Sequence, residues 1–91
     1  MELKWTSKAL SDLARLYDFL VLASKPAAAR TVQSLTQAPV ILLTHPRMGE
    51  QLFQFQPREV RRIFAGEYEI RYELTGQTIY VLRLWHTREN R

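Results

Sequence analysis

The sequence of 91 residues contains no cysteine, which excludes both a disulfide framework and a thiolate zinc site. Its three glycines stand apart at positions 49, 66 and 76, which excludes a glycine-rich phosphate-binding loop. No run approaches the roughly 20 apolar residues that a membrane-spanning helix needs, and the N-terminus lacks a basic stretch followed by an apolar segment. We therefore expect a cytoplasmic protein that makes no membrane contact and is held together by its core alone.

Residues with metal-binding or nucleophilic chemistry are also sparse. His45 and His86 have no nearby cysteine and do not show the H-x-x-x-H spacing of a helical metal site. The sequence patterns that surround a nucleophilic serine are absent as well. We expect neither a metal nor a cofactor.

The composition is that of a basic globular domain. Hydrophobic residues make up 46% of the chain and charged residues 24%, a balance typical of ordered proteins. A chain of this length forms one domain, which we expect to span residues 1–91. The net charge is +4, and ten of the thirteen basic residues are arginine. Because arginine forms planar, bidentate contacts with phosphate and carboxylate groups, the composition favours an anionic partner.

The first quarter of the chain shows the period of an amphipathic helix. Residues 3–6 are expected to form a short strand, and Ser7 is expected to be the N-cap of a helix over residues 8–24. The apolar stripe of this helix would comprise Leu10, Leu13, Tyr17, Leu20 and Val21. Phe19 and Leu22 lie outside the stripe, so they are either scattered surface residues or part of a surface that a partner covers.

A second helix is predicted to begin at Pro26, because proline suits the first position of a helix. Its apolar face would comprise Ala28, Val32, Leu35, Leu42 and Leu43. Pro39 removes a backbone hydrogen bond and clashes with the preceding turn, at a cost of about 3 kcal/mol in a straight helix. We therefore expect a kink at Pro39, after which the helix continues to Leu43.

After a loop at residues 45–49 the apolar period changes from 3.6 to 2, which predicts strands over residues 59–64, 67–74 and 78–86. The middle strand has alternating apolar residues, namely Tyr68, Ile70, Tyr72 and Leu74. The last strand is apolar on both faces, which is typical of a central strand, and the N-terminal strand can pair beside it. The predicted fold is α+β with the order β-α-α-β-β-β, in which a helical hairpin packs on one face of a small antiparallel sheet.

Pairing of these strands would bring together basic residues that lie far apart in the sequence: Arg58, Arg61, Arg62, Arg71, Arg83, His86, Arg88 and Arg91. Such a surface could hold RNA phosphates, with His86 as an acid or base near neutral pH. Alternatively, Arg71 pairs with the neighbouring glutamates, the other arginines are ordinary solvated charges, and His86 makes a structural hydrogen bond. The residues alone leave both interpretations open.

Five motifs in the right order resemble those of the RelE/ParE toxin superfamily. They are Trp5-Thr6-Ser7-Lys8-Ala9, Pro46-x-x-Gly49, Val60-Arg61, Tyr68-Glu69-Ile70-Arg71-Tyr72 and Val81-Leu82-Arg83-Leu84-Trp85-His86-Thr87-Arg88. The resemblance spans nearly the whole chain. It implies the toxin of a bacterial type II toxin–antitoxin system, neutralised in a hetero-oligomer by a small ParD-like antitoxin encoded beside it.

The superfamily divides by target. RelE-like members cleave messenger RNA on the ribosome with basic residues of the sheet, and they commonly have an arginine where this sequence has Glu69. A carboxylate there would repel the scissile phosphate, and Glu50 and Gln51 stand where such nucleases often carry lysine. The resemblance therefore favours the ParE-like branch, whose members inhibit DNA gyrase and so DNA replication. A RelE-like, ribosome-dependent mRNA endonuclease is the first alternative, and a toxin relic or adaptor that only binds an antitoxin or operator complex is the second.

The resemblance implies three sets of site residues. Contacts with gyrase are expected from Arg71, Arg83, His86, Arg88 and Arg91. A nuclease would instead use Arg61, Arg62, Arg83, His86 and Arg88. The antitoxin is expected to contact Leu16, Phe19, Leu22, Arg58 and Arg62.

Overall fold

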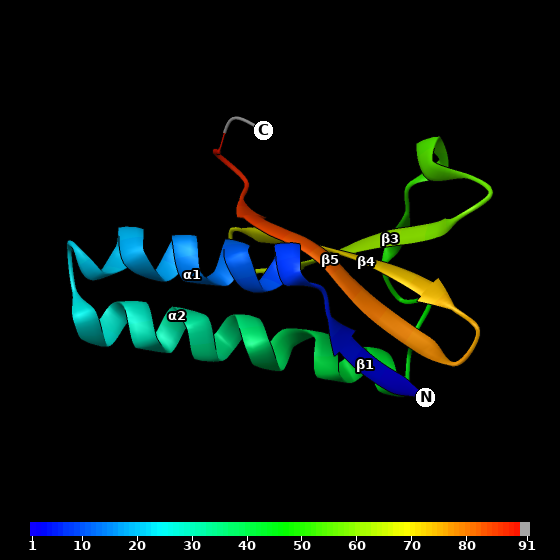
Figure 1. Ribbon diagram of the computed structural model, residues 1–91, viewed down its shortest axis with the longest axis horizontal. Coiled ribbons are helices and arrows are strands. Elements are labelled where there is room, and N and C mark those ends of the chain that lie inside the picture. Colours follow the sequence, from blue (N-terminus) through cyan, green and yellow to red (C-terminus); the bar gives the residue numbers. More distant parts are fainter. Residues whose placement is uncertain (90–91) are drawn as a thin grey trace.

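The computed structural model describes residues 1–89 and shows a helical hairpin packed against a five-stranded sheet (Figure 1). In chain order the elements are β1 (Glu2–Trp5), α1 (Ser7–Val21), α2 (Lys25–Gln37), the 3-10 helix η1 (Ala38–Leu43), β2 (Glu50–Gln51), the 3-10 turn η2 (Phe53–Phe55), β3 (Glu59–Ala65), β4 (Tyr68–Thr75) and β5 (Thr78–His86). The predicted α+β class and element order are confirmed. Two short elements that were not predicted, β2 and η2, lie between the helices and the main strands.

The strand order in the sheet is β1-β5-β4-β3-β2. Strands β3, β4 and β5 form the predicted antiparallel meander, and β5 lies between β4 and β1 as expected of a central strand. Strand β1, however, runs parallel to β5, so the sheet is mixed rather than wholly antiparallel. A parallel neighbour requires a long crossover connection, and here both helices and the other strands intervene between the two partners.

Helix α1 begins at Ser7, one residue earlier than predicted, because Thr6 rather than Ser7 is its N-cap. The Thr6 hydroxyl accepts a hydrogen bond from the Ala9 N–H at 3.2 Å and donates one to the Val81 carbonyl at 2.8 Å. This double role ties the start of α1 to β5. The buried residues of the helix are Ala9, Asp12, Leu13 and Leu16. Leu13 of the predicted stripe is buried, but Leu10 is 54% exposed, so the buried face is rotated toward Asp12 and Leu16.

Helix α2 is capped by Ser24, whose hydroxyl accepts a hydrogen bond from the Ala27 N–H at 3.3 Å. The helix ends at Gln37, and the chain continues as the tighter η1 across the buried Pro39. The helix therefore changes type at Ala38 instead of continuing as the one kinked α-helix that was predicted. A 3-10 continuation avoids the mid-helix clash of proline while keeping the chain on the same path.

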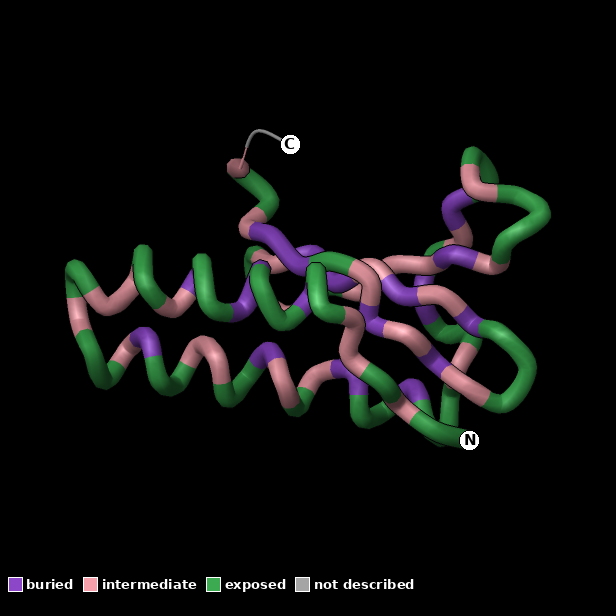
Figure 2. Tube along the Cα trace, viewed as in Figure 1, coloured by how far each residue is buried: buried purple, intermediate pink, exposed green. Residues whose placement is uncertain are grey.

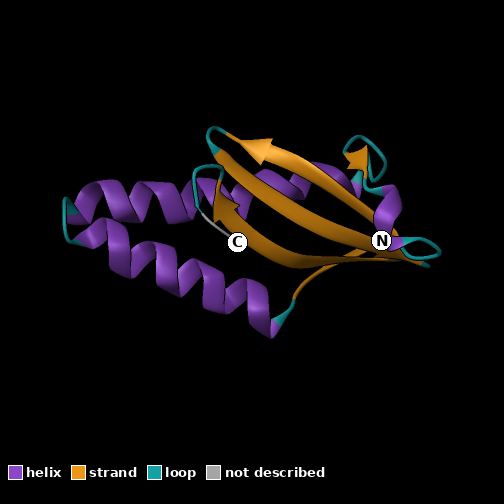
Figure 3. Cartoon of the chain, turned by 90° about the horizontal axis from the view of Figure 1, so that it is seen from above, coloured by secondary structure: helices purple, strands orange, loops and turns teal. Residues whose placement is uncertain are grey.

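The core lies between the helical hairpin and the sheet (Figure 3), and its buried positions recur along both helices and the central strands (Figure 2). One cluster comprises Ala9, Leu13, Leu16, Leu35, Ile70, Val81 and Leu84. A second cluster comprises Leu42, Tyr72, Leu74 and Ile79. The alternation of side chains along β5 is interrupted at Leu82, because the pairs Arg71–Arg83 and Tyr72–Val81 leave that residue without a partner on β4. This bulge lets Val81 and Leu84 both face the helices.

The loop that precedes β2 is anchored by the buried Tyr72. Its hydroxyl donates a hydrogen bond to the Pro46 carbonyl at 2.7 Å and accepts one from the Gly49 N–H at 3.1 Å. Arg61 also donates to the Gly49 carbonyl at 2.8 Å. A Cβ at position 49 would stand 2.6 Å from the Tyr72 hydroxyl and 2.7 Å from the Arg62 carbonyl. The close approach of the loop to the sheet therefore requires glycine.

We expect Gly49→Ala to lower the free energy of unfolding by about 1–3 kcal/mol, the usual cost of forcing an extra methyl group into a closely packed site. Urea denaturation measured by circular dichroism checks this value. Gln54→Ala, at an exposed position, serves as the control. A Gly49→Ala midpoint equal to that of the control would show that the loop can move away from Tyr72 without cost.

Candidate functional site

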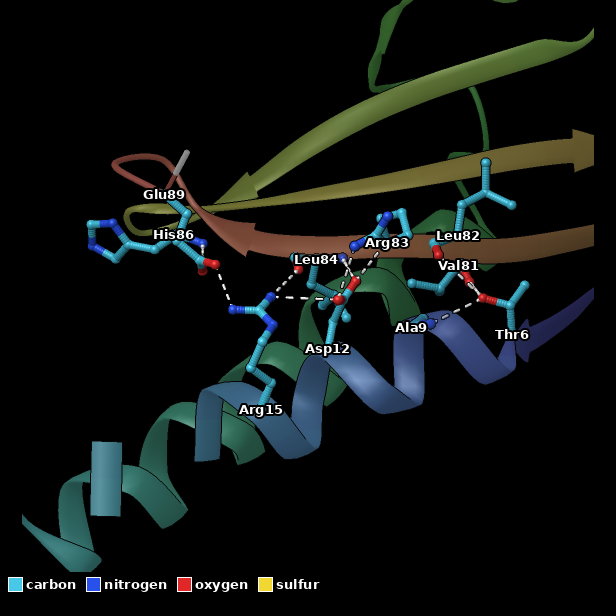
Figure 4. Close-up of polar contacts among 10 residues, drawn as sticks. All are labelled: Thr6, Ala9, Asp12, Arg15, Val81, Leu82, Arg83, Leu84, His86 and Glu89. Atoms are coloured by element: carbon cyan, nitrogen blue, oxygen red, sulfur yellow. Dashed lines mark hydrogen bonds and ion pairs between the residues drawn. The ribbon is translucent and has the colours of Figure 1, made fainter. Parts of the chain in front are cut away.

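Strand β1 covers only the first half of β5, pairing with Thr78 to Val81. Further along, two side chains of α1 take its place (Figure 4). The Asp12 carboxylate accepts a hydrogen bond from the Leu84 N–H at 2.9 Å, and Arg15 donates to the Leu84 carbonyl at 3.4 Å. Because an uncovered strand edge leaves N–H and C=O groups unpaired, these contacts satisfy both backbone groups of Leu84 beyond the end of β1.

The same carboxylate holds Arg83. The guanidinium donates from Nε to Asp12 Oδ2 at 2.8 Å and from Nη2 to Oδ1 at 3.2 Å, which is a bidentate pair. Asp12 is only 4% exposed. Burial by itself would raise the pKa of Asp12, but the hydrogen bonds from Arg83 and from the Leu84 N–H outweigh it and hold the pKa below its ordinary value. Arg83 is therefore fixed against α1 by a charged carboxylate.

A tight turn follows β5. The Glu89 carboxylate accepts a hydrogen bond from the His86 N–H at 2.8 Å and pairs with Arg15 (Figure 4). His86 Nδ1 accepts one from the Arg88 N–H at 3.1 Å, and its ring packs edge-on against Tyr68 with centroids 5.1 Å apart. Arg88 itself is 83% exposed and lies 4.0 Å from a Glu67 oxygen. Among residues 1–89, the end of β5 thus presents the exposed Arg88 guanidinium beside a hydrogen-bonded His86.

Three arginines form a row across β3, β4 and β5, because Arg62 is paired in register with Arg71 and Arg71 with Arg83. Like charges opposite one another are unfavourable in a sheet. The buried Glu69 compensates for them, since its carboxylate lies 3.1 Å from Arg71 and 3.6 Å from Arg62 and is only 1% exposed as a residue. Glu50 adds a contact with Arg62 at 2.9 Å.

Aromatic rings enclose the middle of this row. The Arg71 guanidinium lies 4.8 Å from the Trp85 ring centroid and 5.2 Å from that of Phe55. Trp85 also lies 5.6 Å from the guanidinium of Arg83. Cations stacked on aromatic faces are attracted to the rings and lose part of their water. The middle of the row is therefore packed rather than open to a polyanion.

The remaining predicted arginines of β3 and its flank are also paired. Arg61 donates to Glu59 at 2.9 Å, and Glu59 in turn accepts two hydrogen bonds from Arg47. These contacts hold the pKa of Glu59 below its ordinary value, the bond from Arg47 having the largest effect. Arg58 makes a bidentate pair with Glu73, at 2.8 and 3.1 Å.

An apolar groove of about 680 Å³ lies between the second half of α1 and the end of β5. Its apolar lining is formed by Leu16, Phe19, Leu20 and Tyr68, and its polar lining by Arg15, His86, Arg88 and Glu89. Phe19 is 71% exposed, whereas Leu16 is nearly buried and belongs to the core cluster. A second groove of about 520 Å³ lies between α2 and the β3–β4 turn, and Tyr68 and His86 line both grooves.

Comparison with known proteins identifies the family. Residues 3–91 match the sequence family described as the ParE toxin of the type II toxin-antitoxin system, parDE. The chain belongs to this ParE toxin family. It is 35% identical over 85 residues to the protein named Toxin RelE1 from Caulobacter vibrioides, covering 92% of this chain and 90% of that protein. A solved structure titled as the chromosomal ParDE TA system from P. aeruginosa has a TM-score of 0.80 at 28% identity, covering 94% of this chain and 95% of that one.

A ParE-family toxin is one half of a toxin–antitoxin pair, so an antitoxin is its partner. Within residues 1–89, the ParE-family chain has no helix that is both long and apolar enough to cross a membrane.

In this ParE-family fold the predicted basic cluster is divided. Arg62, Arg71 and Arg83 share one row, whereas His86 and Arg88 lie at the end of β5 beside the apolar groove. Arg91 lies outside the described residues. Of the residues predicted to contact the antitoxin, Leu16 and Phe19 line the groove. Leu22 is exposed but does not line it, and Arg58 and Arg62 are paired with glutamates elsewhere on the sheet.

Sequence reasoning missed Asp12, Arg15, Tyr68 and Glu89 as parts of this region. Asp12 lies outside the apolar stripe that the sequence predicts for α1. A signal was present in the strand lengths, because β1 was predicted over four residues and β5 over nine. A β5 edge longer than its partner needs another source of hydrogen bonds, and the adjoining helix is the nearest one.

Proposed function

We propose that this ParE-family toxin inhibits DNA gyrase and is neutralised by an antitoxin bound to the groove of Leu16, Phe19 and Leu20. The observation that supports gyrase over RNA cleavage is the pairing of the arginines with carboxylates. Arg61, Arg62 and Arg83 each have a carboxylate oxygen within 2.9 Å. To bind a scissile phosphate these side chains would have to break existing ion pairs, and the buried Glu69 would repel the phosphate from the row. A gyrase target also places the toxin in the cytoplasm.

Binding to a protein target requires exposed contact residues, whereas RNA cleavage would require a catalytic acid and base. Arg88 and His86 provide a cation and a polar ring at the end of β5, beside the groove. Arg83 lies on the same strand, with its side chain still 44% exposed despite the pair with Asp12. We therefore assign the gyrase contact to this end of the sheet, with Arg71 playing a structural part between its two aromatic rings.

A RelE-like nuclease is the second candidate, because the relative from Caulobacter vibrioides is named Toxin RelE1. Its residues would be Arg61, Arg62, Arg83, His86 and Arg88. One comparison separates the two candidates. The purified protein should block supercoiling of relaxed plasmid by gyrase and should leave messenger RNA intact on translating ribosomes. Unaffected gyrase together with new cleavage ends at A-site codons in primer extension would establish the nuclease instead.

The proposed antitoxin site has a defined chemistry. Exposed apolar side chains, chiefly Phe19, form its wall, and Arg15 and Arg88 add positive charge to its lining. An antitoxin segment with apolar residues spaced along one side and carboxylates near them fits such a groove. Expression of this toxin without its antitoxin should therefore arrest growth, and co-expression of the neighbouring antitoxin gene should restore it.

A further inference from the structure

The turn after β5 is connected to helix α1 through one side chain. Arg15 pairs through Nη1 with Glu89, and its Nη2 lies 3.4 Å both from Asp12 and from the Leu84 carbonyl (Figure 4). Asp12 is buried and accepts the hydrogen bond of the Leu84 N–H, so both groups belong to the packed junction between α1 and β5. Arg15 therefore joins the turn to a fixed part of the fold.

Glu89 is the acceptor that shapes the turn. Its other carboxylate oxygen receives the His86 N–H at 2.8 Å, and its own N–H donates to the His86 carbonyl at 2.9 Å. Within the same turn, the Arg88 N–H donates a hydrogen bond to His86 Nδ1. The positions of the His86 ring and of the Arg88 side chain thus depend on a carboxylate whose charge is matched by Arg15.

We propose that Arg15 is a positioning residue of the toxic end: by holding Glu89 it orders the turn that presents His86 and Arg88 to the target. This inference rests on the proposed function, because it takes the end of β5 as the toxic surface. The proposal adds Arg15, which lies 71 positions before His86 in the sequence, to the residues on which toxicity depends. Arg15 contacts the turn but need not touch the target.

The expected signature is local. The Arg15 and Glu89 side chains are both partly exposed, and ion pairs between such groups contribute little to global stability. Loss of Arg15 should therefore leave the unfolding midpoint almost unchanged while the turn opens more often. A general structural role would instead lower the midpoint and accelerate exchange throughout α1 and β5.

The experiment combines amide hydrogen exchange with growth arrest, using the full-length chain. Arg15→Ala should accelerate exchange of the His86 and Glu89 amides about tenfold, and about fivefold more toxin per cell should be needed for the same growth arrest. Lys8→Ala, which removes an exposed charge from the same helix, is the matched control. Arg15→Lys should recover part of both effects, because it keeps the charge without the second donor.

Glu89→Gln completes a double-mutant cycle, since glutamine keeps an oxygen for the His86 N–H but loses the charge that Arg15 pairs with. The double variant should be no weaker than either single variant. Three outcomes would each overturn the proposal. The Arg15→Ala variant could match Lys8→Ala in exchange and toxicity, or the losses of toxicity in the cycle could be additive. Exchange at the turn could also become faster without any loss of toxicity. Growth arrest can be measured whichever target the toxin has. If the toxin arrests growth but does not inhibit gyrase, only the proposed target is overturned. A wild-type chain that arrests nothing would overturn both.

Discussion

Asp12→Ala should lower the free energy of unfolding more than the loss of any other charged side chain of α1. Asp12 accepts hydrogen bonds from the Leu84 N–H and from Arg83, and it is almost completely buried. Removing one partner of a fully buried pair costs about 3–5 kcal/mol. Because the Arg83 side chain is partly exposed and can regain water, the expected loss here is about 2–3 kcal/mol. Urea denaturation at pH 7 measures it.

Two further variants separate the contributions. Asp12→Asn keeps an oxygen for the Leu84 N–H but removes the charge. Its free energy of unfolding should therefore lie between those of wild type and Asp12→Ala. Asp18→Ala removes an exposed carboxylate from the same helix and should have an effect within about 0.5 kcal/mol of zero. Equal losses for Asp12→Ala and Asp18→Ala would mean that water replaces the carboxylate at the β5 edge without cost.

The contribution of the Asp12 charge should also depend on pH. The native pKa lies below the ordinary value of 3.8, so the unfolded chain takes up the proton first as the pH falls. The stabilisation is therefore present in full above about pH 5 and disappears as the pH falls through the native pKa. The difference in unfolding free energy between wild type and Asp12→Asn should shrink as the pH falls from about 5 to about 3, a range that spans the ordinary pKa of aspartate. A difference that stays constant over this range would contradict the assigned role of the charge.

The parts of the fold that the sequence predicts well are those with strong local signals. The alternation of β4 from Tyr68 to Leu74 predicted which of its apolar side chains face the core, and Pro39 indicated that α2 is interrupted near Ala38. The rotation of α1 could not be predicted in this way, because it depends on where the helix lies beside β5. Its buried face includes Asp12, and a carboxylate is almost never assigned to a core without a known partner.

The same limit applies to the site. The convergence of Arg62, Arg71 and Arg83 follows from strand pairing, and the structure confirms that they form one row. What each arginine binds depends on residues from other elements, such as Asp12 on α1 and Phe55 in η2. Charge counting along the chain could not show that carboxylates already occupy most of these guanidinium groups. Glu69 is the exception, since its place in the middle strand was visible in the sequence.

Phe19→Asp should weaken binding of the cognate antitoxin by about tenfold or more, as expected when a large apolar anchor of an interface is replaced by a charge. Phe19 exposes 71% of its surface at the wall of the groove, while its backbone belongs to the regular α1 helix. Burial of that ring against the partner supplies apolar contact area, whereas aspartate would be desolvated without a partner. Isothermal titration calorimetry with the purified antitoxin measures the change.

The matched control is Leu10→Asp, because Leu10 is also exposed on α1 but lies nine residues earlier and so on the opposite side of the helix. It should leave antitoxin affinity unchanged, and neither variant should alter the unfolding midpoint by much, since neither side chain belongs to the core. In cells, the Phe19→Asp toxin should still arrest growth and should now do so in the presence of its antitoxin. Full neutralisation of Phe19→Asp, with affinity equal to that of Leu10→Asp, would place the antitoxin on another surface and leave the groove without an occupant.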